Sequence, residues 1–422
     1  FFSVQMLSSG PKRLTTSSHA LVFINAVKKN ADSRRTGYQP VVPRPTRVHT
    51  LASQLKEALE NQINWLLLSI PVLFVAKLCG WGDVCIFVSS FLSLIPLAAL
   101  LGDFTEDLAI RSNESLGALL NATFGNATEV IVSIFALKSG MYEVIKNSLV
   151  GSVLGNLLLV LGCAMLASGL RASSINSGVS HNASVAHMYS HLLLMSCFGI
   201  TIPTIYSIAA PSGSKKGLSV EATLSVSREI AVVMIVMYVL FMIFQLGTHK
   251  ELFDDCDDAA GDEDEEAGEE PQYTMTFALS GLAIATILIA IMSECLVDTL
   301  EVASKECGLT QGFVSVILLP IVGNAAEHST AVWMAVKGKM DIAMGVAVGS
   351  SLQIALFAVP TLVLISWGMG KHLDLVFEPF LLTSLWMSVL IGAELLRRGQ
   401  SNWIKGAMLL ALYIMIACTL MH

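Results

Sequence analysis

The chain has 422 residues, of which 54% are hydrophobic and 14% charged, and its formal net charge is −8. Soluble domains average about 45–50% apolar and about 25% charged residues, so this composition excludes an ordinary soluble protein. Acidic residues concentrate between Asp254 and Glu270, whereas the N-terminal segment is basic. These local biases indicate no nucleic-acid partner. No CxxC pair occurs among the eight cysteines, which argues against a zinc site or a disulfide framework.

The first 61 residues are polar, are interrupted by Pro40, Pro43 and Pro45, and carry many lysines and arginines. Such a composition predicts a disordered basic tail. Its positive charge favours the cytosolic side of a membrane. A transit peptide has a similar composition and is the alternative interpretation of this segment.

Eleven apolar segments follow the tail, and a membrane-crossing helix needs about 20 apolar residues. They cover residues 64–80, 83–108, 115–138, 143–169, 188–209, 228–247, 274–302, 310–336, 341–367, 374–396 and 402–421. With the N-terminus inside, most of the 25 lysines and arginines fall on the cytosolic side. The sequence therefore predicts an all-α integral membrane protein with a cytosolic N-terminus and a luminal C-terminus.

The membrane part is predicted to consist of two halves. An acidic cytosolic loop, residues 249–272, separates residues 62–248, which hold six spans, from residues 273–422, which hold five. The acidic run inside this loop either attracts cations by its field or is a solvated linker.

The two halves contain the same motifs in the same register. GNATE, which ends at Glu129, is followed by GSVLGN from Gly151, and GNAAE, which ends at Glu327, is followed by GSSLQI from Gly349. A spacing of 198 residues separates both pairs. Because the glutamates lie in the third and eighth spans, those two spans cross in opposite directions. Duplicated units of opposite topology are typical of secondary transporters, which bind their cargo near the midplane. We expect one extra helix plus a five-plus-five inverted repeat.

Glu129 and Glu327 are the candidate ion ligands. A carboxylate inside the membrane is costly and usually faces a pathway or a partner. Each glutamate follows a Gly-Asn pair, which weakens a helix and would turn Asn126 and Asn324 inward. Two carboxylates, two amide oxygens and freed carbonyls suit Ca²⁺, which takes about six to eight oxygen ligands. The alternative for each glutamate is a buried carboxyl group that bonds a neighbouring hydroxyl.

The same carboxylates would account for proton coupling. A low dielectric and a second nearby carboxylate both favour the protonated form of a carboxyl group. We therefore expect the pair to take up protons when Ca²⁺ leaves and to release them when Ca²⁺ returns. Competition for one site would convert a proton gradient into calcium movement.

Polar residues in the GSxL segments are predicted to complete the metal site. They are Ser152 and Asn156 in the fourth span and Ser350 and Gln353 in the ninth. Small and polar residues in membrane helices also serve close packing and hydrogen bonding between helices, which is the alternative.

A second set is predicted to form a proton pathway or gate. Glu106 lies in the second span, and Glu294 and Asp298 share one face of the seventh because they are four residues apart. Solvated helix ends are the alternative for these acids. His328 follows Glu327 directly and either orients it or is a satisfied buried histidine.

GNATEVIVSIFALKSG, GSVLGNLLLVLG and LLPIVGNAAEH closely resemble the cation/proton exchanger (Ca²⁺/H⁺ antiporter) family of the Ca²⁺/cation antiporter superfamily. The resemblance runs from about Trp65 to the C-terminus. It implies eleven spans, alternating access, and the two GNxxE glutamates, Glu129 and Glu327, as ion ligands. It also implies transport of Ca²⁺ and H⁺ without a cofactor, a vacuolar membrane location, and Mn²⁺ as additional cargo of some members. Plant-type members often carry a glutamate where this chain has Ala99, a form that resembles fungal-type members.

Three other functions fit the sequence less well. A sodium/calcium exchanger of the same superfamily would use some of the same carboxylates, but the GNAAEH motif favours proton coupling. A cation channel would more often show a filter loop or identical subunits. An intramembrane metalloprotease would need an HExxH motif, which the sequence lacks. We therefore expect a transporter, not an enzyme, and leave its oligomeric state open.

Overall fold

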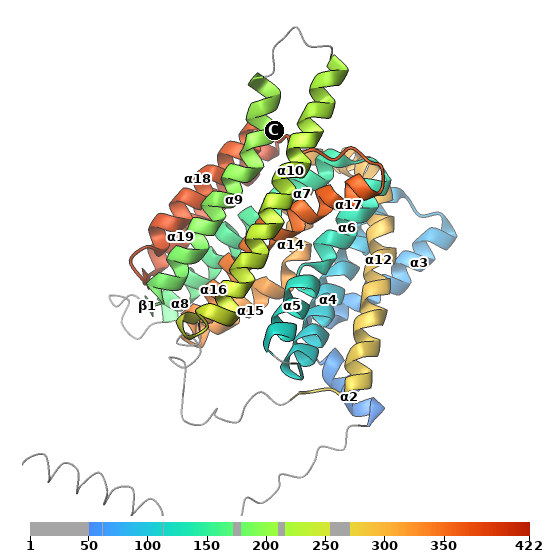
Figure 1. Ribbon diagram of the computed structural model, residues 1–422. Coiled ribbons are helices and arrows are strands. Elements are labelled where there is room, and N and C mark those ends of the chain that lie inside the picture. Colours follow the sequence, from blue (N-terminus) through green and yellow to red (C-terminus); the bar gives the residue numbers. More distant parts are fainter. Residues whose placement is uncertain (1–49, 61, 113, 172–178, 210–215, 254–270) are drawn as a thin grey trace, which may run out of the picture. The chain divides into compact units, whose positions relative to one another are not determined.

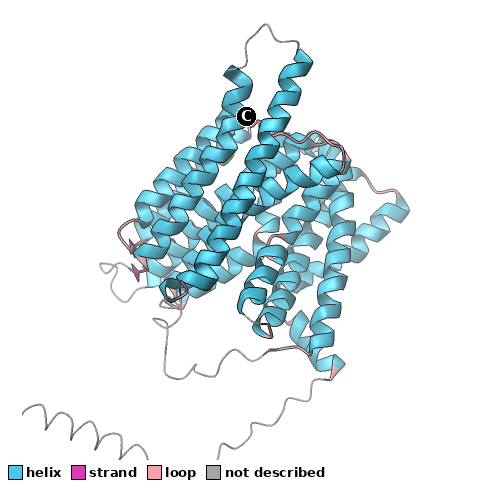
Figure 2. Cartoon of the chain, in the orientation of Figure 1, coloured by secondary structure: helices cyan, strands magenta, loops and turns pink. Residues whose placement is uncertain are grey.

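The computed structural model describes residues 50–422 except 61, 113, 172–178, 210–215 and 254–270. Most of the predicted basic tail and the acidic run within residues 249–272 lie outside these residues. The described chain is almost entirely helical (Figure 2). This confirms the predicted all-α membrane fold.

The first half of the described chain is a succession of helices (Figure 1). They are α2 (Leu51–Leu59), the 3₁₀ segment η1 (Gln62–Leu68), α3 (Ser69–Cys79), α4 (Asp83–Ile110), α5 (Glu114–Phe124), α6 (Ala127–Lys138), α7 (Tyr142–Leu154), the π-helical segment η2 (Gly155–Val160), α8 (Leu161–Arg171), α9 (Ala183–Ala209), α10 (Lys216–Ile243) and the π-helical segment η3 (Phe244–Thr248).

The second half is a similar succession of helices, and one short strand from each half forms a two-stranded sheet. Its helices are α12 (Met275–Glu306), α13 (Gln311–Phe313), the π-helical segment η4 (Val314–Leu318), α14 (Leu319–Gly323), α15 (Ala325–Val336), α16 (Met340–Gln353), the π-helical segment η5 (Ile354–Ala358), α17 (Val359–Gly368), α18 (Pro379–Leu396) and α19 (Trp403–Leu420). The two-residue strand β1 (Val179–Ser180) pairs antiparallel with β2 (Gln400–Ser401).

Eight helices of the described part are long and apolar enough to cross a membrane. Residues 63–79 and 311–323 form shorter apolar helices, and the chain between Glu114 and Lys138 is divided into α5 and α6. Each of the eleven predicted spans overlaps helical structure, but the count of eleven crossings stays a prediction.

The predicted helix breaks at the Gly-Asn pairs are confirmed. Asn126 separates α5 from α6 with φ −107° and ψ 22°. Asn324 separates α14 from α15 with φ −91° and ψ 19°. Glycine and asparagine both have low helix propensity, so the same dipeptide interrupts both helices. Each break places the following glutamate in the first turn of a new helix.

The prediction of disorder up to residue 61 is wrong for α2. Leucines at every fourth position, Leu51, Leu55 and Leu59, line one exposed side of this helix. On the other side Gln54 is buried, and its Oε1 accepts hydrogen bonds from the backbone N–H and the hydroxyl of Thr274. The leucines at helical spacing and this tertiary contact stabilise the helix. The overall polarity of the first 61 residues does not predict it.

Candidate ion-binding site

Glu129 and Glu327 each occupy the third position of a helix that begins inside the membrane part, α6 and α15. Glu129 is only 5% exposed. Both carboxylate oxygens of Glu129, and Oε2 of Glu327, are buried without a hydrogen-bond partner among the described residues. A buried charge without a partner is strongly unfavourable, so these oxygens need a cation or a proton.

Three further oxygens of the repeated motifs are among the other buried polar atoms without a hydrogen-bond partner in the described chain: Ser152 Oγ, Asn156 Oδ1 and Asn324 Oδ1. All three belong to residues that the sequence predicts as cation ligands. Each atom carries lone pairs that can coordinate a hard cation such as Ca²⁺. The unsatisfied atoms in these motifs are therefore oxygen acceptors.

A hydrogen-bond network explains why the amide oxygens are free. The Nδ2 group of Asn156 donates to Ser350 Oγ at 3.0 Å, and Asn324 Nδ2 donates to the carbonyl oxygen of Ser152 at 3.4 Å. Since each amide uses its nitrogen on a protein partner, its oxygen remains for another ligand. The network orients the amides as acceptors.

The same network joins the two repeats. Asn126 Nδ2 donates to Gln353 Oε1 at 2.9 Å, and the Ser350 hydroxyl donates to Asn126 Oδ1 at 3.3 Å. Asn126 precedes α6, whereas Ser350 and Gln353 lie on α16. Asn126 Oδ1 and Gln353 Oε1 thus already accept hydrogen bonds within the protein. These bonds hold the turn before Glu129 against α16 of the second repeat.

Gly323, the last residue of α14, lies next to the carboxylate of Glu129. A Cβ atom at Gly323 would lie 2.6 Å from Glu129 Oε1. The Glu129 carboxylate therefore lies against the backbone of Gly323, four residues before Glu327. Glycine at position 323 makes this approach possible.

A cavity of about 440 Å³ leads to this site. It runs from Ala109 and Gly117, near the end of α4 and the start of α5, to Glu327 and Gln353. Its lining also includes Asp103, Glu106, Asn121, Thr128 and Ser350. We call this end of the helices the cavity face. Glu327 is therefore accessible from the cavity face, while Glu129 lies behind the lining.

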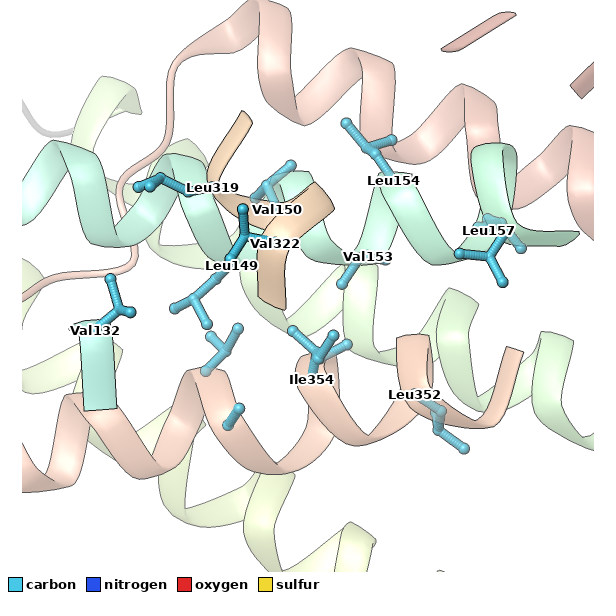
Figure 3. Close-up of a cluster of buried hydrophobic side chains, with 14 of the residues drawn as sticks. Val132, Leu149, Val150, Val153, Leu154, Leu157, Leu319, Val322, Leu352 and Ile354 are labelled. Carbon is cyan, nitrogen blue, oxygen red and sulfur yellow. The ribbon is translucent and has the colours of Figure 1, made fainter. Parts of the chain in front are cut away.

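On the side of Glu129 toward the end of α6 and the start of α7, buried apolar side chains form a cluster (Figure 3). Val132 of α6, Leu149 and Val150 of α7, and Leu319 and Val322 of α14 are all buried there. We call this end the sealed face. Hydrocarbon side chains at interior packing density leave no room for a hydrated ion, so access to Glu129 from this end is blocked.

The chain between α17 and α18 covers the sealed face. The ammonium group of Lys146, on α7, donates to the carbonyl oxygen of Val376 at 2.6 Å and to Asp374 Oδ1 at 3.3 Å. Leu375 and Phe377 of this segment are buried. Polar and apolar contacts together fasten the covering segment to the first repeat.

The chemistry of the donors limits which cation fits. No group of three or more His, Cys, Asp or Glu side chains is assembled anywhere in the described ranges. The candidate site instead combines two carboxylates with neutral amide, hydroxyl and carbonyl oxygens. Such a set suits Ca²⁺ or Mn²⁺ and lacks the sulfur and imidazole ligands that copper and zinc prefer.

The predicted proton-pathway residues divide into two groups. Glu106 lines the 440 Å³ cavity, together with Asp103, which sequence reasoning missed. The sequence does contain a signal for Asp103, because a residue three positions before Glu106 lies on the same face of the helix. Glu294 and Asp298 are exposed on α12 and line neither this cavity nor the neighbouring 320 Å³ cavity. His328 is half-buried and also lines neither cavity.

Comparison with known proteins shows the family of the chain. Residues 83–247 and 277–421 match the family described as sodium/calcium exchanger protein. The chain is 42% identical to a Ca²⁺/H⁺ antiporter of Aphanothece halophytica, over 83% of this chain and 94% of the relative. It is 39% identical to the vacuolar cation/proton exchanger 1a of rice, Oryza sativa subsp. japonica, over 93% and 87%.

The solved structure of YfkE is similar as well. It is 35% identical to this chain, superposes with a TM-score of 0.71, and the match covers 85% of this chain and 99% of YfkE. The chain belongs to the sodium/calcium exchanger family and, within it, to the cation/proton exchangers.

Proposed function

We propose that the protein is a secondary transporter that exchanges Ca²⁺ for H⁺ by alternating access, with Glu129 and Glu327 as the shared binding groups. The observation that carries the proposal is the set of buried oxygens without donors, which belongs to Glu129, Glu327, Ser152, Asn156 and Asn324. Oxygens that find no donor in the protein are matched by a hard cation or, on the carboxylates, by protons.

The charge of the site explains why exchange would be obligatory. Two carboxylates with one Ca²⁺ are neutral, and so are two protonated carboxyl groups. An empty site would place two negative charges among buried apolar side chains, which is strongly unfavourable. Only the protein with an occupied site would therefore switch from opening on one side of the membrane to opening on the other. Each ion would then cross only in exchange for the other.

The route follows from the cavity. Ca²⁺ would enter past the carboxylates of Asp103 and Glu106, which raise the local cation concentration, and reach Glu327 first. Full coordination would recruit Glu129 and the amide oxygens of Asn156 and Asn324. Protons displaced from the carboxylates would leave by the same cavity.

The names of relatives support the choice of coupling ion and location. Relatives at about 40% identity are named Ca²⁺/H⁺ antiporter and vacuolar cation/proton exchanger, and a relative of Schizosaccharomyces pombe, 38% identical, is named vacuolar calcium ion transporter. We place this protein in the vacuolar membrane with the cavity face toward the cytosol, the N-terminus cytosolic and the C-terminus luminal. Mn²⁺ suits the same hard ligands and is a second candidate cargo.

The test is Ca²⁺ uptake by the full chain in proteoliposomes with an acidic interior. We expect uptake of radiolabelled Ca²⁺ to require the pH gradient, to collapse with a protonophore, and to be the same in sodium and in choline. Uptake that follows a sodium gradient would make the protein a sodium/calcium exchanger. Uptake that proceeds down the Ca²⁺ gradient without a counter-ion would indicate a channel and contradict the proposal.

A further inference from the structure

The short helix α2 turns an apolar side away from the protein. Its contact with the protein is made by Gln54 and Ala58, which are four residues apart and buried. The leucines of α2 also recur every four residues, so they share a different side. Leu51, Leu55 and Leu59 are 74%, 51% and 46% exposed. The helix is therefore held by a glutamine and an alanine, while its largest apolar side chains remain uncovered.

A polar side completes the helix. Ser53 and Lys56 are exposed and lie away from both the buried side and the leucines. In a helix on the surface of a soluble protein, the apolar stripe packs against the core. Here the apolar stripe is the uncovered one, an arrangement typical of helices that lie in the plane of a membrane surface.

Hydrogen bonds at both ends of α2 place it beside the ends of apolar helices. Gln54 Oε1 accepts from the backbone N–H of Thr274 at 2.8 Å and from its hydroxyl at 3.0 Å. Thr274 is the N-cap of α12, which is long and apolar enough to cross a membrane. Asn64 Nδ2 donates to the carbonyl oxygen of Ala58 at 2.8 Å, at the start of the apolar helix of residues 63–79. Thus α2 lies where two apolar helices begin (Figure 1).

Trp65 marks the same level. It directly follows Asn64 in η1, and 76% of it is exposed. Tryptophan is enriched where membrane helices enter the polar headgroup region, because its ring is apolar and its N–H is polar. A helix fixed at this level meets the boundary between lipid headgroups and acyl chains. The surface that covers the exposed leucines is therefore lipid.

We propose that α2 lies in the membrane interface at the cavity face, with Leu51, Leu55 and Leu59 among lipid acyl chains and with Ser53 and Lys56 toward water. The partner is the bilayer surface itself. The hydrogen bonds of Gln54 then tie the first turn of α12 to that surface.

The attachment reaches the edge of the cavity through the residue before Thr274. The backbone N–H of Tyr273 donates to Asp107 Oδ1 at 3.0 Å. Arg111, whose Nε is 3.0 Å from Asp107 Oδ2, also donates to the carbonyl oxygen of Tyr273. Asp107 directly follows Glu106, which lines the 440 Å³ cavity. Membrane-bound α2 therefore holds the junction of α4 and α12 next to the cavity.

A fluorescent label tests the placement of α2. We take the full chain with its native cysteines replaced by serine or alanine, require the wild-type melting temperature, and place it in phosphatidylcholine nanodiscs. A nitrobenzoxadiazole label on Leu55→Cys should show blue-shifted emission and quenching by lipids brominated on their acyl chains. The same label on Ser53→Cys should emit as in water and be quenched by iodide.

Two results would overturn the placement. Equal quenching by iodide at both positions would put the leucines in water. A label on Leu55→Cys that neither iodide nor brominated lipid quenches would show that a protein surface, such as a second copy of the chain, covers them.

Hydrogen exchange gives an independent measurement on the chain with its native cysteines. In nanodiscs, the amides of residues 51–59 should exchange at least about tenfold faster in the double variant Leu51→Gln and Leu55→Gln, because two leucines lose their burial in lipid. The matched double variant Ser53→Gln and Lys56→Gln should exchange as wild type does. Wild-type exchange in the leucine variant, or the same acceleration in both variants, would contradict the proposal.

Discussion

The carboxylate of Glu129 lies directly against the backbone of Gly323: a Cβ atom at Gly323 would be 2.6 Å from Oε1 and 2.9 Å from Cδ of Glu129. One repeat therefore supplies the carboxylate and the other supplies the space for it. The two GNxxE motifs are interdependent, because the glycine of the second motif admits the glutamate of the first.

Gly323→Ala is expected to weaken Ca²⁺ binding while the protein still folds. The added methyl group must displace a flexible carboxylate, and overpacking of this kind costs on the order of 1–3 kcal/mol, or roughly 5- to 150-fold in affinity. Equilibrium Ca²⁺ binding to purified protein measures it, with Gly368→Ala as the control. Wild-type affinity in Gly323→Ala would show that Glu129 does not bind Ca²⁺ in this position.

Gln353→Ala should lower Ca²⁺ affinity without removing any carboxylate. Gln353 accepts the hydrogen bond of Asn126 and so helps to hold the turn before Glu129. Loss of a residue that orients a ligand typically costs about 10- to 100-fold in metal affinity. Asn64→Ala is the matched control, because it removes a buried amide that bonds Ala58 in the first helices. Equal losses in both variants would mean a general loss of stability.

Glu106→Gln should raise the Ca²⁺ concentration needed for half-maximal uptake from the cavity face, because Glu106 lines the cavity. A charge that acts through its field is screened by salt, so the difference from wild type should shrink at high ionic strength. Glu294→Gln, whose side chain lines neither described cavity, should leave this concentration unchanged from that side. A larger effect of Glu294→Gln would reassign the entry path.

His181 should make stability depend on pH. It lies outside the membrane helices, between α8 and α9, and its Nε2 bonds the carbonyl oxygen of Leu396 at 3.1 Å. Burial lowers the pKa of His181 below its usual value of 6.5. The unfolded chain therefore binds the proton more readily, so the contribution is complete above about pH 6.5 and is lost as the pH falls through the folded-state pKa.

Thermal unfolding in detergent between pH 7.5 and 5.5 measures this effect. The melting temperature of wild type should fall toward the acidic end, and His181→Gln should flatten that fall. His187→Gln serves as the control, because His187 is more exposed than His181. A fall of the same size in His181→Gln would assign the pH dependence to other groups.

The sequence predicts the helix breaks and the buried glutamates because both have local signals. A Gly-Asn pair weakens a helix wherever it occurs, and an acid inside a long apolar segment is conspicuous. The all-α fold follows from the apolar segments alone. Those parts of the prediction depend on the identity and order of residues along the chain.

The other features of the site depend on contacts between segments that are far apart in the sequence. The bond from Asn156 to Ser350, which leaves the asparagine oxygen free, joins two repeats. The approach of Glu129 to Gly323 likewise joins segments that no local pattern relates. The exposed positions of Glu294 and Asp298 depend on how α12 is rotated about its axis. Gly151 lies against a neighbouring backbone and Gly349 does not, although the two repeats place glycine at both positions.

The central claim is that Ca²⁺ and protons compete for Glu129 and Glu327. The most direct measurement is the release of protons when Ca²⁺ is added to purified protein in weakly buffered detergent near neutral pH. We predict release in proportion to bound Ca²⁺ in wild type, less in Glu129→Gln and in Glu327→Gln, and neither binding nor release in the double variant. Ca²⁺ binding without proton release, or wild-type binding by the double variant, would contradict the account.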